Sequence, residues 1–254
     1  MTASRSDGKS DTDPNQPAKP ALRRASRWEV RPVGDRYGVF GDDRPLRTPE
    51  GKDVVVASRP LAEAIAGEMQ AQATARSLDI AGLPNLRLAA TAIDRVAAAR
   101  EAYIDAIAAY GETELLCHRA EHPADLVERQ HAVWQPLLDW VSARFGAPLG
   151  NTAGVMPQRQ SAAALAALRA AVAGYDDDLL AALGFVVQTS GSLVVGLAMV
   201  EGRLDAEQAF AVAELDETYQ IEQWGEDAEA TQRRAARRKD LAQAADFIAL
   251  VRKA

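Results

Sequence analysis

The sequence contains few cysteines, histidines and aromatic residues: one cysteine, three histidines and 6% aromatics in 254 residues. The single cysteine, Cys117, excludes an internal disulfide and is typical of a reducing compartment. We expect it to be a small buried apolar group, because no base partner for a nucleophilic thiol can be placed. Hydrophobic residues make up 48% of the chain, and much of that is alanine, the best helix former. The composition therefore favours a mainly helical protein.

Motifs for nucleotide binding and hydrolysis are also absent. There is no glycine-rich phosphate-binding pattern, no G-x-S-x-G turn and no H-E-x-x-H zinc motif. The histidines form no metal set, because Pro123 disfavours a helix joining His118 to His122. The pair Glu128 and His131 lacks the second copy that a di-iron site needs. We therefore predict no cofactor and no metal site.

Acidic residues outnumber basic ones, 36 to 29, and the formal net charge of −7 argues against a nucleic-acid partner. The charge is unevenly distributed towards the C-terminus. Residues 201–229 hold ten acids and one arginine, whereas residues 230–254 hold seven bases and two acids. Such neighbouring segments form either an ordinary solvated surface or a docking surface with its own sign of charge.

The first 27 residues have no apolar run and are rich in serine, proline and charged residues. This composition predicts a disordered tail over residues 1–27. The tail has no hydrophobic stretch typical of a secretory signal, and its acidic residues argue against an organelle transit peptide. We therefore expect a protein of the bacterial cytoplasm.

Segments with a preference for β-structure are confined to residues 28–58. The turn sequences "GDD" and "PEG" separate "RYGVF", "RPLRT" and "KDVVVAS", a pattern typical of hairpins. We predict an antiparallel sheet of two to four strands, which must pack on another element to be stable. Residues 59–254 have helical periodicity. The predicted fold class is therefore α+β, a small antiparallel β-rich N-terminal region packed on a larger all-helical domain.

Apolar spacing and capping residues define the expected helices. Pro60 opens one helix, another follows Pro84, and Asp205 with Gln208 forms a capping box. Pro136 is expected to kink or divide its helix, and "GNTAG" is expected to be a loop. The other predicted helices span Arg100–Tyr110, Pro123–Phe145, Gln158–Val172, Asp205–Gln223 and Asp227–Arg252.

The most apolar segment is Leu179–Val200, which carries no charge. A stretch of this length could span a membrane. Its centre, however, reads "QTSGS", and acids rather than positively charged residues flank it. We predict a buried central helix or two helices that meet near Gly191, with a membrane span at 179–200 as the alternative.

The segment "LDETYQIEQWGED", residues 215–227, combines five carboxylates with one tyrosine and one tryptophan. On a helix, Val212, Leu215 and Tyr219 form an apolar stripe, and Glu222 lies at its edge. A carboxylate at that edge either makes a structural salt bridge to an arginine of the final helix or binds a partner's arginine or backbone amides.

Glu214 and Glu217 lie on an adjacent face of the same predicted helix. Two carboxylates can act as acid and base in a hydrolase. No set of polar residues that would bind a substrate accompanies them, so a hydrolase with a paired-carboxylate site stays only an alternative.

Six blocks of the sequence occur in order between about Arg44 and Ala230: "RPLRTPEGKDVVVASRPLAEAIAGEMQAQ", "AATAIDRVA", "ELLCHRA", "HAVWQPLLDW", "SGSLVVGLAMVEGRLD" and "LDETYQIEQWGEDAEA". Together they resemble the assembly chaperones of the ATP synthase catalytic head, and more closely the branch that attends the alpha subunit. Several blocks in order are far more specific than one short motif.

The resemblance implies a protein that is not an enzyme and binds no nucleotide. It implies an assembly chaperone that binds the unassembled alpha subunit and protects it until the beta subunit pairs with it. The implied fold, a β-rich N-terminal region on a helical domain, agrees with the fold predicted from the residues.

The resemblance does not specify which face binds the client. Aromatic anchors with charged neighbours are common at interfaces. The sequence favours a core position for Trp134 and Trp140. We predict that the client contacts are Glu214, Glu217, Glu222 and Trp224.

Overall fold

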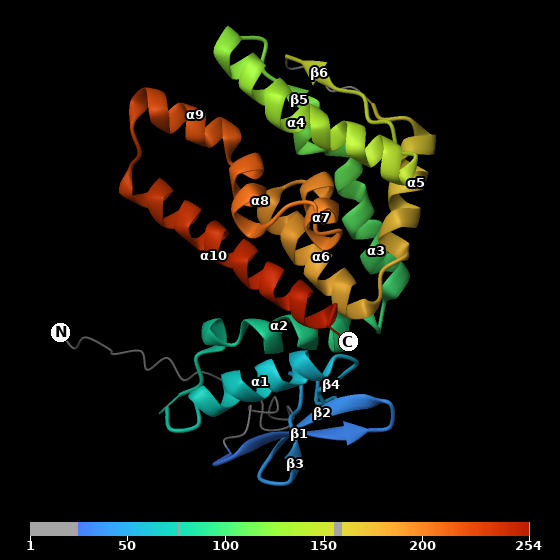
Figure 1. The fold of residues 1–254 in the computed structure, drawn as a ribbon, viewed down its shortest axis with the longest axis vertical. Coiled ribbons are helices and arrows are strands. Elements are labelled where there is room, and N and C mark those ends of the chain that lie inside the picture. Colours follow the sequence, from blue (N-terminus) through green and yellow to red (C-terminus); the bar gives the residue numbers. More distant parts are fainter. Residues whose placement is uncertain (1–24, 76, 155–158, 254) are drawn as a thin grey trace, which may run out of the picture.

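The structure, a computed structural model, describes residues 25–75, 77–154 and 159–253. A small antiparallel sheet with α1 and α2 occupies one end of the molecule, and the remaining helices form a larger body above it (Figure 1). The fold class is α+β, as predicted.

The sheet is built on the central strand β2. One neighbour is β1, and both short strands β3 and β4 pair with β2 along its other edge, all antiparallel. The "GDD" sequence forms a tight turn because Asp42 and Asp43 both adopt positive φ, at 46° and 66°. The strands are β1 (Trp28–Val33), β2 (Arg36–Gly41), β3 (Arg44–Pro45) and β4 (Val55–Val56).

Residues 25–27 of the predicted tail contact the folded part of the chain. Ala25 is buried, and the amides of Ser26 and Arg27 both donate to the Asp42 carboxylate. The rest of the predicted tail, residues 1–24, lies outside the described residues.

Two helices accompany the sheet, α1 (Arg59–Ala71) and α2 (Pro84–Thr91). The Ser58 hydroxyl caps α1, with Pro60 in the first turn as predicted. The same hydroxyl donates to the carbonyl of Leu250 at 2.6 Å, which ties the start of α1 to the last turn of the chain's final helix.

The helical body contains eight helices among the described residues: α3 (Arg100–Ala108), α4 (Ala124–Phe145), α5 (Ala162–Ala173), α6 (Asp177–Ser190), α7 (Leu193–Val200), α8 (Ala206–Ala213), α9 (Leu215–Trp224) and α10 (Ala228–Val251). Short 3-10 or π-helical turns lie between α1 and α4. They are Ile80–Gly82 before α2, Ala92–Val96 before α3, and Ala109–Thr113 and Leu115–Cys117 after α3.

Two local predictions differ from the structure, and a third is reduced to one of its alternatives. Pro136 lies inside α4 without dividing it, so the predicted kink is the alternative that stays a prediction. "GNTAG" is not a plain loop, because β6 (Thr152–Ala153) pairs in parallel with β5 (His118–Arg119), and a two-residue strand leaves no periodic pattern in the sequence. The helix expected from Gln158 begins at Ala162, because Ser161 caps it.

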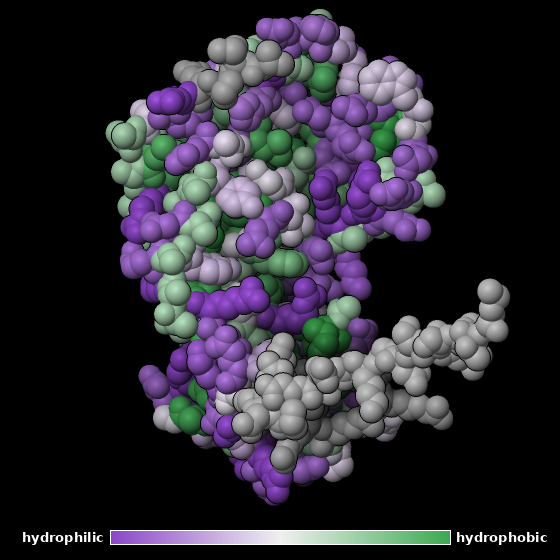
Figure 2. Space-filling view, turned by 180° about the vertical axis from the view of Figure 1, so that it is seen from behind, coloured by the Kyte–Doolittle hydropathy of each residue, from purple (hydrophilic) through white to green (hydrophobic). Residues whose placement is uncertain are grey.

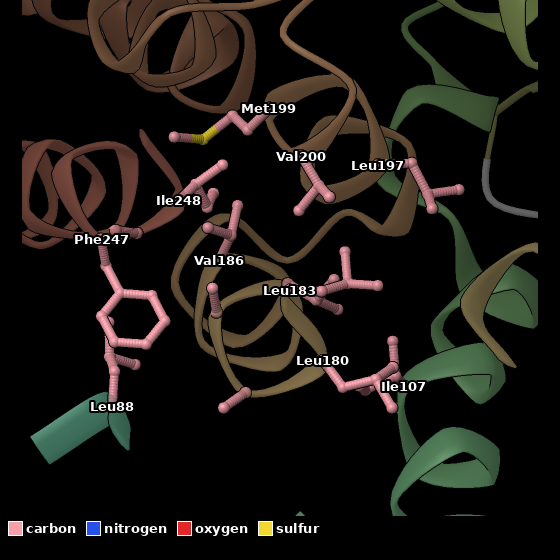
Figure 3. Close-up of a cluster of buried hydrophobic side chains, with 14 of the residues drawn as sticks. Leu88, Ile107, Leu180, Leu183, Val186, Leu197, Met199, Val200, Phe247 and Ile248 are labelled. Carbon is pink, nitrogen blue, oxygen red and sulfur yellow. The ribbon is translucent and has the colours of Figure 1, made fainter. Parts of the chain in front are cut away.

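The core is centred on α6 and α7. Every residue of α7 is buried, and Figure 3 shows Leu183 and Leu197 of these helices in one apolar cluster with Ile107 of α3 and Phe247 of α10. Gly191 ends α6 with a φ of 73°. The apolar segment is therefore two helices that meet at Gly191, one of the predicted arrangements. No helix among the described residues is long and apolar enough to cross a membrane.

One carboxylate is fully buried at the start of α7. Glu114 accepts hydrogen bonds from the Ser192 hydroxyl and from the amides of Leu193 and Val194. Burial raises the pKa of Glu114, although these hydrogen bonds oppose the shift.

Candidate functional site: the faces of α9

The acidic segment forms α9, which is separate from α8 although one helix over Asp205–Gln223 was predicted. The predicted capping box of Asp205 and Gln208 is present, but the helix breaks at Glu214. The apolar spacing runs on across the break, because Val212, Leu215 and Tyr219 are all buried as the predicted stripe requires. The pattern therefore could not reveal the break.

Glu214 is turned towards the final helix. Its carboxylate is 4% exposed and accepts from Nη1 of Arg234 at 2.9 Å and from Nη1 of Arg237 at 2.5 Å. The sequence offered a structural salt bridge to the final helix for Glu222, and the structure gives that role to Glu214. A buried carboxylate with two arginines fixes α10 against the α8–α9 junction.

A second face of α9 packs on α4. The Tyr219 hydroxyl lies 2.9 and 3.0 Å from the two carboxylate oxygens of Asp125, and Nε2 of Gln130 donates to Asp216 at 2.8 Å. This face also carries Glu222, which is 46% exposed and pairs with Arg129 of α4 at 2.9 Å. The hydrogen bond from Arg129 holds the pKa of Glu222 below its usual range, so the carboxylate is charged at neutral pH.

The third face of α9 carries Glu217, Ile221 and Trp224, spaced by four and three residues and therefore aligned along the helix. Trp224 is 78% exposed, and Ile221 is half-buried. The Glu217 side chain is half-buried and makes no hydrogen bond or ion pair with any residue that the structure describes. We call these three residues the α9 outer face.

The arginines of α10 do not form a free basic surface next to this face. Arg234 contacts Thr218 and Glu226 besides Glu214. Arg238 pairs with Glu207, and Arg233 pairs with Glu229. The guanidinium groups of Arg234 and Arg238 also lie 5.2 and 5.8 Å from the ring centre of Phe210. Because these cations are engaged within the chain, the α9 outer face keeps an acidic character.

Metal and thiol chemistry is not supported by the described part of the chain. No group of three or more His, Cys, Asp or Glu residues there could hold a metal. Cys117 is buried, as predicted, and burial raises the pKa of its thiol to about 12. The thiol is therefore protonated at neutral pH and unsuited to nucleophilic attack.

Comparison with known proteins gives similar structures over nearly the whole chain. Atp12 of Paracoccus denitrificans is 38% identical, with 91% of this chain and 98% of that chain covered and a TM-score of 0.85. A point mutant of the same protein matches at 37% identity with the same coverage and TM-score. The chain belongs to the ATP12 chaperone family. The family model, described as ATP12 chaperone protein, matches residues 25–142.

A third ATP12-like structure is Atu1473 of Agrobacterium tumefaciens, a candidate chaperone. It is 36% identical, with 89% of this chain and 84% of that chain covered and a TM-score of 0.83. The resemblance seen in the sequence is thus confirmed: this ATP12-family protein is a chaperone of ATP synthase assembly and not an enzyme. The hydrolase alternative is excluded.

The structure does not place the four residues that were predicted to contact the client on a single face of α9. It brings Glu217 and Trp224 together on the α9 outer face, places Glu222 at the α4 side, and buries Glu214. The sequence interpretation missed Asp125 and the α4 residues beside it. The spacing of four between Asp125 and Arg129 did put two charges on one helix face, but nothing in the sequence linked that face to α9.

Proposed function

We propose that this ATP12-family chaperone binds the unassembled alpha subunit of the ATP synthase catalytic head in the bacterial cytoplasm. It protects that subunit from aggregation until the beta subunit pairs with it. The order of the sequence blocks, which resembles the alpha-attending branch of the family, supports the choice of subunit.

The observation that carries the contact surface is Trp224 beside Glu217. Only three large hydrophobic side chains are exposed among the described residues, namely Val33, Ile80 and Trp224, and Trp224 is the most exposed of them. Tryptophan is enriched among the residues that contribute most to binding at interfaces. An unpaired carboxylate about two helical turns away can accept a hydrogen bond from a partner's arginine or backbone amide.

The four predicted residues then have different parts in the contact. Trp224 and Glu217 bind the client directly, and Glu222 lies at the margin, where its carboxylate is half exposed and paired with Arg129. Glu214 acts indirectly, because its ion pairs with α10 fix the direction in which α9 presents its outer face.

The test is binding of the purified chain to isolated alpha subunit and, separately, to isolated beta subunit, measured by calorimetry. Light scattering of the alpha subunit with and without the chaperone measures protection. We expect a stoichiometric complex with alpha alone, reduced scattering, and release when beta is added. Equal binding to both subunits, or binding without any effect on scattering, would contradict the proposal.

A further inference from the structure

A groove away from α9 lies where α2, α6 and α10 meet. It encloses about 330 Å³, the open solvent at its mouth included, and its lining residues are Pro84, Arg87, Leu88, Thr91, Phe185 and Gln243. The space-filling view shows the molecule hollowed on the side where α10 faces the part that carries α2 (Figure 2). The groove has room for a side chain or two, not for a whole helix.

The groove has an apolar floor and a polar rim. Leu88 and the half-buried ring of Phe185 belong to the floor. The guanidinium of Arg87 and the side-chain amide of Gln243 stand at the rim, and neither has a hydrogen-bond or ion-pair partner among the residues described. The Thr91 hydroxyl already donates to the Arg87 carbonyl at 3.0 Å. The free donors of the rim therefore belong to Arg87 and Gln243.

The charge at this rim is opposite to that of the α9 outer face. The arginines of α10 next to α9 are engaged with acids of the same chain, whereas Arg87 is exposed and has no such acid. Arg87 differs from other exposed cations without an ion pair, such as Arg44 of β3, because it stands at the rim of an apolar groove. Planar guanidinium groups bind carboxylates through two parallel hydrogen bonds.

We propose that this groove binds one acidic side chain of the client, with the neighbouring apolar residue of the client on Leu88 and Phe185; this inference rests on the proposed function. Arg87 and Gln243 donate to the carboxylate. Figure 1 shows α10 running from the end of α9 down to α2. The 15 residues from Ala228 to Gln243 rise by about 22 Å in a helix. The client is thus held at two points of opposite charge, the α9 outer face and this groove, which fixes its orientation.

The test compares Arg87→Glu with Arg44→Glu in the full chain, using isolated alpha subunit as the probe. Arg44 is also exposed and without an ion pair, but it lies in β3, away from the groove. We expect Arg87→Glu to weaken binding roughly 10- to 100-fold, the effect of a lost charged hydrogen bond, and Arg44→Glu to leave it unchanged. Arg87→Lys keeps the positive charge but loses the two parallel N–H donors of the guanidinium, so its affinity for the alpha subunit should lie between those of the two other variants.

The outcomes separate this inference from the proposed function. If the unaltered chain does not bind the alpha subunit, the proposed function fails. If it binds and Arg87→Glu binds equally well, the groove inference alone is overturned. Gln243→Glu puts a negative charge at the same rim from α10. If Arg87→Glu lowers the melting temperature, weaker binding of Gln243→Glu supports the groove inference and unchanged binding overturns it. A photo-crosslinker at Gln243 should capture an alpha-subunit peptide with an aspartate or glutamate at the crosslink, and capture of a peptide without one contradicts the proposal.

Discussion

Trp224 stands at the C-terminal end of α9 with most of its indole in water. An exposed tryptophan contributes little to the stability of a folded chain, but burying it against a partner removes a large apolar area from water. We expect Trp224→Ala to change the free energy of unfolding by less than about 0.5 kcal/mol. Binding to the alpha subunit should weaken by at least about 2 kcal/mol, as for other dominant interface residues.

Ile80→Ala is the matched control for Trp224, because Ile80 is also an exposed large hydrophobic residue and lies in the 3-10 turn before α2. Denaturant unfolding and calorimetric titration on both variants decide the question. Normal affinity of Trp224→Ala would show that the α9 outer face is not the contact surface.

Glu222 pairs with Arg129 on the surface, where ion pairs add little to the stability of the fold. We expect Glu222→Gln to melt at the same temperature as the unaltered chain and to bind the alpha subunit about tenfold more weakly. A destabilised variant with normal affinity, or a variant unchanged in both respects, would show that Glu222 does not contribute to client binding. Glu217→Gln, on the outer face itself, should weaken binding at least as much.

The side-chain positions on α9 could be predicted only in part. The stripe of Val212, Leu215 and Tyr219 was correct, because helical spacing determines which residues share a face. The direction of Glu214 was not accessible, because it depends on the break between α8 and α9 and on two arginines of α10 that are 20 and 23 residues away. Periodicity contains no information on such a tertiary contact.

The α9–α10 hairpin depends on the ion pairs of Glu214. Removing that charge leaves Arg234, which is 16% exposed, without its main acidic partner, while Arg237 can turn to water. We expect Glu214→Gln to lower the free energy of unfolding by about 2–3 kcal/mol, less than for a fully buried pair. Urea unfolding measures the loss, and Glu207→Gln, which breaks the exposed pair with Arg238, is the control.

Helices and strands could be predicted where the sequence contains a strong local signal. Gly191 between two apolar runs indicated a junction of two helices as one of two predicted arrangements, and the positive φ there explains why glycine is favoured. The pairing of β5 with β6 and the π turn at Ala92–Val96 escaped prediction. Both are set by packing against distant segments and leave no local pattern.

At the scale of the molecule, the sequence predicts a tail over 1–27, a β-rich region over 28–58 and a helical domain over 59–254, and we propose this division with the tail shortened to 1–24. Ala25 is buried, and the amides of Ser26 and Arg27 donate to Asp42 in the turn between β2 and β3, so a truncation should keep these three residues. Because the composition of residues 1–24 cannot support a core, their removal should leave the melting temperature and the affinity for the alpha subunit unchanged. Removal of residues 1–27 should lower the melting temperature, and equal melting of both truncations would contradict this.

The pH dependence of stability is also a property of the whole molecule. Asp178, in the first turn of α6, is buried, and its burial together with the nearby Asp176 raises its pKa to about 6, although Arg36 of β2 opposes the shift. Burial raises the pKa of Glu114 and Glu68 as well. These folded carboxyl groups hold protons that the unfolded chain has already released, so their contribution to the free energy of unfolding should fall as pH rises from about 4 to 6. The lowered pKa of Glu222 contributes in the opposite direction.

Asp178→Asn isolates the contribution of that one group. The amide cannot ionise, so the variant should lose part of the pH dependence and gain about 1–3 kcal/mol of stability at pH 7, since each unit of pKa shift corresponds to about 1.4 kcal/mol. Urea unfolding at pH values from 4 to 7 measures both effects. Asp35→Asn, at an exposed position in the turn between β1 and β2, is the control for removing one carboxylate. If Asp178→Asn is instead less stable at pH 7, then the charged carboxylate stabilises the junction with Arg36, and the assignment of Asp178 as a destabilising buried charge is wrong.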